Sequence, residues 1–124
     1  MTTNSNDIRE RSFEFALSTI KNCKRIKEKH KEFILTDQLA RSSTSVGANM
    51  REARNAESKA DFIHKLSICQ KECDESKYWL ELLMALLDSE KERLLPIHDE
   101  AHQLLRIIKT ISLRTKQNAN WKKR

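Results

Sequence analysis

The chain is short, basic and nearly free of the residues that interrupt helices. It has 124 residues, with 24 Lys and Arg against 18 Asp and Glu, which gives a net charge of +6. Its one glycine is Gly47 and its one proline is Pro96, so it lacks the turn residues that an all-β fold of this length needs. A chain of this length fits one domain with its own hydrophobic core. We therefore predict a single all-α domain over residues 1–124.

The sequence carries no sign of membrane insertion or secretion. No stretch approaches the roughly 20 apolar residues of a membrane span, and the polar N-terminus lacks the pattern of a signal peptide. Cys23, Cys69 and Cys73 are odd in number and follow no disulfide framework, so we interpret them as reduced thiols. These features predict a cytoplasmic protein that does not bind membranes.

The first two helices are predicted near residues 7–29 and 36–57, from the helical spacing of apolar residues. Thr36 is the expected N-cap of the second helix. Gly47 costs that helix about 1 kcal/mol of propensity, and we expect close contact with a neighbouring helix to compensate. The stripes expected to be buried are Phe13, Ala16, Leu17, Ile20 and Cys23 in the first helix, and Leu35, Leu39, Ser42, Val46, Met50 and Ala53 in the second.

The last two helices are predicted near residues 58–88 and 96–117. Ser58 and Asp61 form an N-terminal capping pattern, and Pro96 suits the first turn of the fourth helix. The third helix has a seam in steps of four and three, the repeat of left-handed bundle packing. That seam comprises Phe62, Leu66, Cys69, Cys73, Ser76, Leu80, Leu83 and Leu87. The fourth helix is expected to turn inward Ile97, Ala101, Leu104, Ile108 and Ile111. Together these patterns predict an antiparallel up-and-down four-helix bundle with a basic tail over residues 118–124.

The candidate functional residues are cations near two helix ends. After Glu100 the chain has no acidic residue, and Trp121 stands among the last positive charges. Lys and Arg neutralise phosphates and Trp stacks on bases, which is typical of single-strand or RNA binding. The cations of the C-terminal segment are Arg106, Lys109, Arg114, Lys116, Lys122, Lys123 and Arg124, and those of the first helix are Lys21, Lys24, Arg25 and Lys27. We predict a binding protein for RNA or DNA, although helix capping and solvation also account for these charges.

A second hypothesis is a protein-interaction scaffold. Ile63, Trp79, Leu82 and Leu86 widen the apolar face of the third helix beyond one seam. A face of that width can serve the bundle and a partner protein or neighbouring subunit together.

Enzyme and metal chemistry have weaker support. Asp61 and His64, like Asp99 and His102, have the spacing of a di-iron site in a helical bundle. However, both aspartates lie in predicted first turns and both histidines fall off the apolar seams, so we expect the histidines to face water. Cys69 and Cys73 on the seam are interpreted as small apolar fillers. No phosphate loop or nucleophile elbow is present, so we expect no catalytic activity, cofactor or metal.

Two segments resemble a known family. Ser45-Val-Gly-Ala-Asn49-Met-Arg-Glu52-Ala53 resembles the Ser-Ile-x-x-Asn-Ile-x-Glu-Gly signature of the bacterial four helix bundle protein family, with Ala53 where Gly is usual. That family includes proteins encoded by intervening sequences inside large-subunit ribosomal RNA genes. Residues 61–80 resemble its third helix. The positions that carry the resemblance are Ser45, Asn49, Glu52, Phe62, Glu75 and Trp79.

The resemblance implies an assembly as well as a fold. It implies a ring-shaped homopentamer, with no catalytic residues to carry over. A relative of the family is the accessory protein of diversity-generating retroelements, which binds nucleic acid and a reverse transcriptase. We expect the signature residues to act structurally, with Asn49 and Glu52 hydrogen-bonding across an interface.

Overall fold

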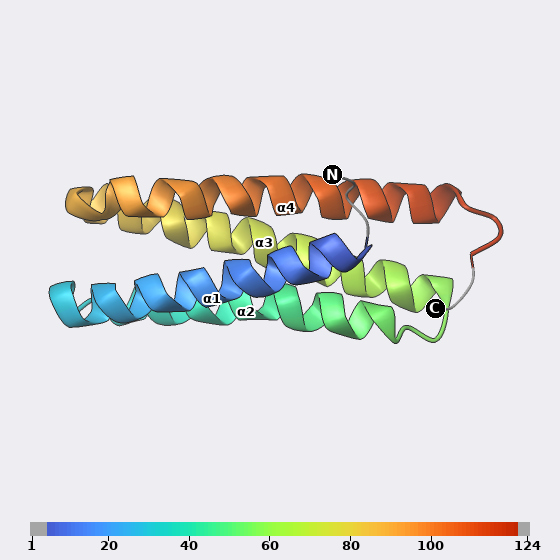
Figure 1. Cartoon of the computed structure of the whole chain (residues 1–124), viewed down its shortest axis with the longest axis horizontal. Helices are drawn as coiled ribbons and strands as arrows, with labels where there is room; N and C mark the ends of the chain where they lie inside the picture. The colour runs from blue at the N-terminus through green and yellow to red at the C-terminus, as the bar shows by residue number, and fades with distance from the viewer. Residues whose placement is uncertain (1–4, 122–124) are drawn as a thin grey trace.

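The architecture is an all-helical bundle. The computed structural model describes residues 5–121, with side chains from residue 8 onward. Between residues 5 and 121 there are four α-helices and no strand. The helices are α1 (Ser5–His30), α2 (Ile34–Arg54), α3 (Lys59–Leu86) and α4 (Lys91–Gln117), with a short 3₁₀ turn, η1 (Asp88–Glu90), before α4. They run alternately up and down, and each contacts the next one along the chain, with α4 also contacting α1 (Figure 1). The predicted four-helix bundle is confirmed.

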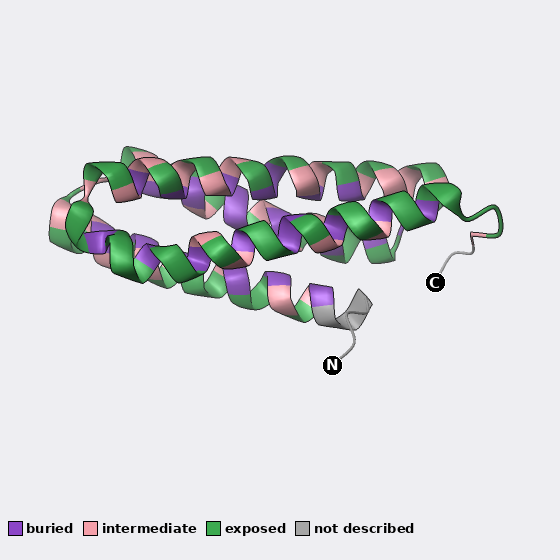
Figure 2. Cartoon of the chain, turned by 90° about the horizontal axis from the view of Figure 1, so that it is seen from above, coloured by how far each residue is buried: buried purple, intermediate pink, exposed green. Residues whose placement is uncertain are grey.

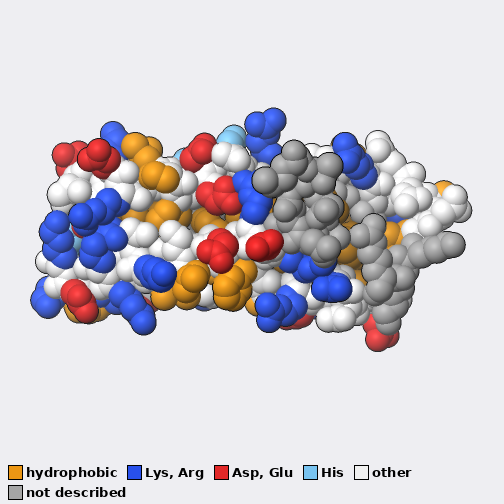
Figure 3. Space-filling model, viewed as in Figure 1, with side chains coloured by type: hydrophobic (Ala, Val, Ile, Leu, Met, Phe, Trp, Pro, Cys, Tyr) orange, Lys and Arg blue, Asp and Glu red, His pale blue; other side chains and the backbone are white. Residues whose placement is uncertain are grey.

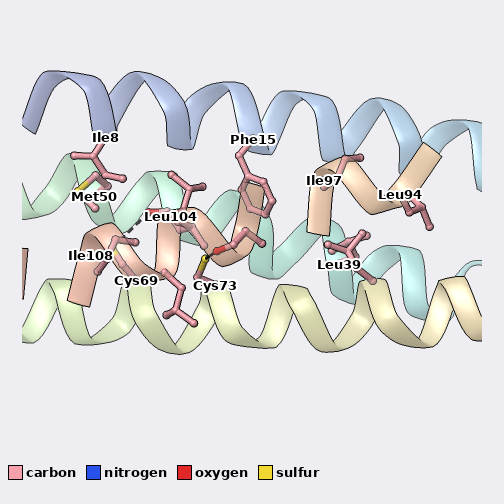
Figure 4. Packing of buried hydrophobic residues seen from close by; sticks show 14 of the residues in the cluster. Ile8, Phe15, Leu39, Met50, Cys69, Cys73, Leu94, Ile97, Leu104 and Ile108 are labelled. Atoms are coloured by element: carbon pink, nitrogen blue, oxygen red, sulfur yellow. Dashed lines mark hydrogen bonds between the residues drawn. The ribbon is translucent and has the colours of Figure 1, made fainter. Parts of the chain in front are cut away.

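The buried stripes of α2, α3 and α4 include most of the residues predicted from the sequence, and also Thr36, Glu72 and Leu94. They meet along the axis of the bundle, where purple stripes face one another in Figure 2 and side chains interdigitate in Figure 4. The largest aliphatic members are Leu39, Val46, Leu66, Leu80, Leu83, Leu94, Leu104 and Ile108. Leu35, Phe62, Leu87 and Ile111 pack against this core from its edge.

The thiols of α3 are part of the core. The Sγ atom of Cys73 donates to the carbonyl oxygen of Ala101 at 3.0 Å, across the α3–α4 contact. Burial raises the pKa of Cys69 and of Cys73 to about 12, so both stay protonated at neutral pH. Free Cys in such surroundings behaves as a small apolar side chain with a weak donor, as the sequence predicted.

The buried face of α1 differs from the prediction. Phe13 and Leu17 are 55% and 38% exposed, whereas the inward stripe is Ile8, Ser12, Phe15, Thr19, Cys23 and Ile26. Ser12 and Thr19 can occupy this stripe because each hydroxyl donates a hydrogen bond to a backbone carbonyl of α1. Thr19 Oγ1 donates to the carbonyl of Phe15 at 2.7 Å, and Ser12 Oγ donates to that of Arg9 at 2.9 Å. A satisfied hydroxyl can be buried at little cost, so counting apolar residues alone selected the wrong face.

The beginning of α2 is capped by Glu32 rather than by Thr36. Glu32 Oε1 accepts hydrogen bonds from the backbone N–H groups of Leu35 at 2.8 Å and Thr36 at 3.1 Å. The Thr36 side chain is buried and donates to the carbonyl of Glu32 at 2.7 Å. The cap predicted for α3 is confirmed, since Ser58 accepts from the backbone N–H of Asp61 at 3.0 Å.

α4 begins earlier in the chain than the predicted range of 96–117. The helix begins at Lys91, so Pro96 lies inside it rather than in its first turn. Leu94 and Ile97 are both buried, and their packing in the core favours a continuous helix across the proline. Pro96 is exposed and lacks the N–H that would pair with the carbonyl of Glu92, which water can reach instead.

Gly47 lies inside α2, on the side facing α1. A Cβ atom there would lie 3.6 Å from the carbonyl oxygen of Ser12, which is an ordinary van der Waals contact. The approach of α1 therefore leaves room for a methyl group, and the expected close contact does not require glycine.

We predict that Gly47→Ala raises the free energy of unfolding by about 0.5–1 kcal/mol, because alanine loses less backbone entropy in a helix. Urea denaturation measures the change. Ala48→Gly, at the exposed neighbouring position of the same helix, is the matched control and should lower stability by a similar amount. A destabilised Gly47→Ala variant would show that α1 packs more tightly than described.

Candidate nucleic-acid interface

The cations proposed from the sequence lie at two opposite ends of the bundle. α1 and α4 run in opposite directions, so their C-terminal halves point to different ends (Figure 1). With 27 residues rising about 1.5 Å each, α4 is about 40 Å long. Figure 3 shows the Lys and Arg group of α1 at the left end of the molecule. One chain therefore does not bring the two predicted groups together.

Two cations of the α1 group are engaged in ion pairs. Arg25 Nη2 lies 2.5 Å from Oε1 of Glu90, and Nε2 of His30 lies 3.1 Å from Oε2 of the same carboxylate. Burial alone would raise the pKa of Glu90, but hydrogen bonds from Arg25 and His30 outweigh it and hold that pKa below its ordinary value. Lys27 pairs with Asp37. Arg25 thus ties α1 to the start of α4.

We predict that Arg25→Ala destabilises the protein by about 3 kcal/mol at neutral pH, because it leaves the fully buried Glu90 carboxylate without its main partner. Lys24→Ala, at an exposed position of the same helix, should change stability by no more than about 0.5 kcal/mol.

Acid provides a second readout of the same substitution. Since the pKa of Glu90 is lowered by folding, its pairing stabilises the protein above the unfolded pKa, and this contribution is lost as pH falls through the folded value. The stability difference between wild type and Arg25→Ala should therefore shrink in acid. A difference that is independent of pH would contradict the role of Glu90.

The segment after α4 is fastened to the start of α3. Lys59 Nζ donates to the carbonyl oxygens of Lys116 at 3.3 Å and Asn118 at 2.8 Å. The rings of Trp121 and Phe62 have centroids 6.1 Å apart and are tilted by 44°. Trp121, which the sequence suggested as a base-stacking residue, is thus packed on the bundle. Lys122, Lys123 and Arg124 lie outside the described residues.

A groove between α3 and α4 joins cations that are distant in the sequence. It has a volume of about 320 Å³ and is lined by Ser67, Gln70, Lys71, Asp74, Leu105 and Lys109. Lys71 comes from α3 and Lys109 from α4, and both are exposed. The sequence singled out Lys109 but missed Lys71, because three of the next four residues, Glu72, Asp74 and Glu75, are acidic. Only the packing of α3 on α4 reveals the pair.

Further basic side chains recur along the same face, where Asp74 and the Glu81–His98 ion pair also lie. His102, Lys109 and Lys116 recur every seven residues on α4 and so share the side that faces α3. Lys77 Nζ lies 3.2 Å from Nδ1 of His102, which places a further cation of α3 on this face.

The other two α4 cations that the sequence proposed for binding lie elsewhere. Arg106 is exposed on the outer surface of α4. Arg114 lies eleven residues after Gln103, which accepts a hydrogen bond from Arg11 of α1 at 3.0 Å. Eleven residues are about three helical turns, so Arg114 is on the side of α4 toward α1, away from the groove.

The signature residues gather on the shared face of α2 and α3. Ser42 and Ser76 hydrogen-bond across it at 2.7 Å, and Glu52 pairs with Lys65 at 2.9 Å. Asn49 instead bonds within α2, donating to the carbonyl and to Oγ of Ser45 at 2.8 and 3.0 Å. Glu52 thus pairs between two helices of one bundle, while Asn49 bonds inside its own helix.

Glu75 and Trp79 belong to a polar network at the same face. Trp79 Nε1 donates to Oε2 of Glu75 at 3.0 Å, and Glu75 pairs with Arg41 of α2. Nη1 of Arg41 also lies 3.2 Å from Oε1 of Glu72, whose side chain is mostly buried. These bonds hold the indole against the bundle.

Metal ligands do not converge. Within the described part of the chain, no three His, Cys, Asp or Glu side chains are grouped so that they could hold a metal ion. His64 and His102 are exposed, as their positions off the seams predicted. Asp61 serves the start of α3, where its Oδ2 accepts from the backbone N–H of Glu57 at 3.2 Å. Nor is any helix of residues 5–121 long and apolar enough to span a membrane.

The fold and the polar network define a small up-and-down helical bundle with a signature face between α2 and α3. The family model described as 23S rRNA-intervening sequence protein matches residues 4–110. The chain belongs to this family. It is also similar to a crystal structure from Bacteroides thetaiotaomicron VPI-5482, described as a protein with unknown function from the S23 ribosomal protein family. The identity is 38% over 88% of this chain and 97% of the other, with a TM-score of 0.84. No curated protein matches.

Proposed function

We propose that this protein binds nucleic acid, RNA or DNA, through phosphate contacts in the α3–α4 groove, and acts as a non-enzymatic subunit of a ring-shaped homopentamer. The observation that carries the binding proposal is the convergence of Lys71 and Lys109 on one groove from two helices.

The chemistry of the groove suits a phosphate backbone. Two ammonium groups offer charge, while Gln70 and Ser67 add neutral side chains that can donate hydrogen bonds. Leu105 is the only apolar side chain of the lining, and no aromatic ring lies in it. Binding should therefore depend on charge rather than on base stacking, with little preference for sequence. The lining also includes Asp74, whose negative charge offsets part of the positive charge of the two lysines.

We predict that Lys71→Ala/Lys109→Ala weakens oligonucleotide binding and flattens its salt dependence. Loss of two phosphate contacts should reduce the slope of log K against log salt by about 1.4 for single strands or about 1.8 for duplexes. Fluorescence anisotropy with labelled RNA and DNA, over a series of salt concentrations, measures both quantities.

Lys21→Ala/Lys24→Ala is the matched control, because it removes the same charge from exposed positions at the other end of the bundle. It should leave the slope nearly unchanged if the groove is the binding site. A larger effect of the control variant would move the site to α1, and absence of wild-type binding at low salt would refute the proposal.

The second candidate is a protein-interaction scaffold without direct nucleic-acid contact. It is favoured by large apolar side chains exposed on α3, among them Tyr78 and Leu86. A specific partner, recovered after nuclease treatment and at moderate salt, would support this function. Recovery that disappears with nuclease would favour nucleic-acid binding instead.

A further inference from the structure

The α3–α4 groove contains a carboxylate, Asp74, together with its two lysines. The side chains of Lys71, Asp74 and Lys109 form no hydrogen bond or ion pair with any residue that the structure describes. All three are exposed, so each is available to a ligand. A free carboxylate in a groove that binds phosphates would weaken that binding by repulsion. Its presence is accounted for if the ligand also brings a hydrogen-bond donor to this position.

Asp74 lies midway between two cations of α3. Lys71 precedes it by three residues and Lys77 follows it by three, and residues at this spacing are neighbours on a helix surface. With a rise of 1.5 Å per residue, the two lysines are about 9 Å apart along the helix. The carboxylate therefore has a basic side chain on each side of it.

The opposite wall of the groove has the same order. On α4, Leu105 lies three residues after His102 and four residues before Lys109. α3 and α4 pack side by side in opposite directions (Figure 1). Lys77 Nζ lies 3.2 Å from Nδ1 of His102, which marks one end of the groove, and Lys71 and Lys109 mark the other. Each helix thus contributes one basic side chain to each end.

A nucleic-acid strand that lies along the groove can place a phosphate at each end. The two ends are about 9–10 Å apart by the rise of either helix, which is about three nucleotides at the spacing of a duplex strand and fewer when the strand is more extended. Between the ends the strand presents sugars and phosphates in turn. Asp74 repels a phosphate but not a sugar, so the favoured register places a sugar beside the carboxylate.

We propose that Asp74 accepts a hydrogen bond from the 2′-hydroxyl of a ribose in the groove, and that the protein therefore binds RNA in preference to DNA. This inference rests on the binding function proposed above and names its ligand class. An ionised carboxylate only accepts hydrogen bonds, and the 2′-hydroxyl can donate one. DNA lacks this hydroxyl, so on DNA the carboxylate only repels the backbone.

The bases do not account for such a preference. An amino group of a base can also donate to a carboxylate, but RNA and DNA carry the same amino groups. Recognition of a base by Asp74 would therefore favour certain sequences equally in both nucleic acids. Recognition of the 2′-hydroxyl favours RNA of any sequence, which agrees with a groove that has no aromatic ring in its lining.

The test compares three strands that differ only at the 2′ position. Labelled oligouridine strands of about ten nucleotides carry a 2′-hydroxyl, a 2′-fluoro or a 2′-hydrogen group. Fluorescence anisotropy at low salt measures the affinity of the full-length protein for each strand. The hydroxyl strand should bind about three- to tenfold more tightly than the other two. The fluoro strand keeps the sugar pucker of RNA but cannot donate, so it separates the hydrogen bond from the shape of the sugar.

Substitutions at Asp74 separate the hydrogen bond from the charge. Asp74→Ala removes the acceptor and the charge, so the three affinities should become equal, mainly because the fluoro and DNA strands bind more tightly. Asp74→Asn removes the charge but keeps an acceptor, so part of the preference should remain. Asp99→Ala is the matched control, because Asp99 is an exposed acid bonded to Gln103, which contacts Arg11 on the α1 side of α4. It should leave the preference unchanged.

Two results would overturn the inference. One is a wild-type protein that binds the hydroxyl and fluoro strands equally. The other is an Asp74→Ala variant that keeps the wild-type preference, whether or not all three affinities rise together, because Asp74 would then act only as a repulsive charge. Circular dichroism checks folding, and Asp74→Asn provides the comparison if the alanine variant does not fold.

The same measurements distinguish this inference from the proposal on which it rests. Absence of binding to all three strands, or binding that is unchanged by Lys71→Ala/Lys109→Ala, refutes the groove as a nucleic-acid site. Binding that depends on both lysines but not on the 2′ group refutes only the role of Asp74.

Discussion

The structure depends on one narrow stripe of each helix being turned toward a shared axis. Helices this long can bury only a stripe, and the stripe must repeat every three and four residues to follow its neighbours. Small and hydroxyl-bearing residues share it with leucines: Ser42 and Ser76 are fully buried and satisfy each other at 2.7 Å. Their small size lets α2 and α3 approach, and their hydrogen bond removes the cost of burying two hydroxyls. Residues outside these buried stripes remain at the surface, where they can contact a ligand or a partner.

One buried carboxylate organises the end of the bundle at which α1 terminates. Glu90 sits just before α4 and receives Arg25 and His30 from α1. A buried carboxylate without partners would be costly. Arg25 and His30 therefore pair with Glu90 instead of facing solvent. The basic appearance of this helix end therefore overstates its capacity for an anionic ligand. Lys21 and Lys24 remain at the surface, outside the groove between α3 and α4.

The proposed binding groove, with Lys71 and Lys109, lies where α3 meets α4. A homo-oligomer would repeat this groove in every copy. Several weak phosphate sites held at fixed spacing bind a long polyanion far more tightly than one of them does.

The sequence by itself determined the number and order of helices, the Ser58 cap and most of the inward stripes of α2, α3 and α4, because periodicity and capping are local properties. It also identified the family through segments in α2 and α3. Tertiary structure decided the rest. The inward face of α1 depended on hydroxyls that bond within the helix, and the start of α4 depended on burial of Leu94 ahead of Pro96. The pairing of Lys71 with Lys109 and the commitment of Arg25 to Glu90 join residues far apart in the chain, and no local pattern encodes which helices will meet.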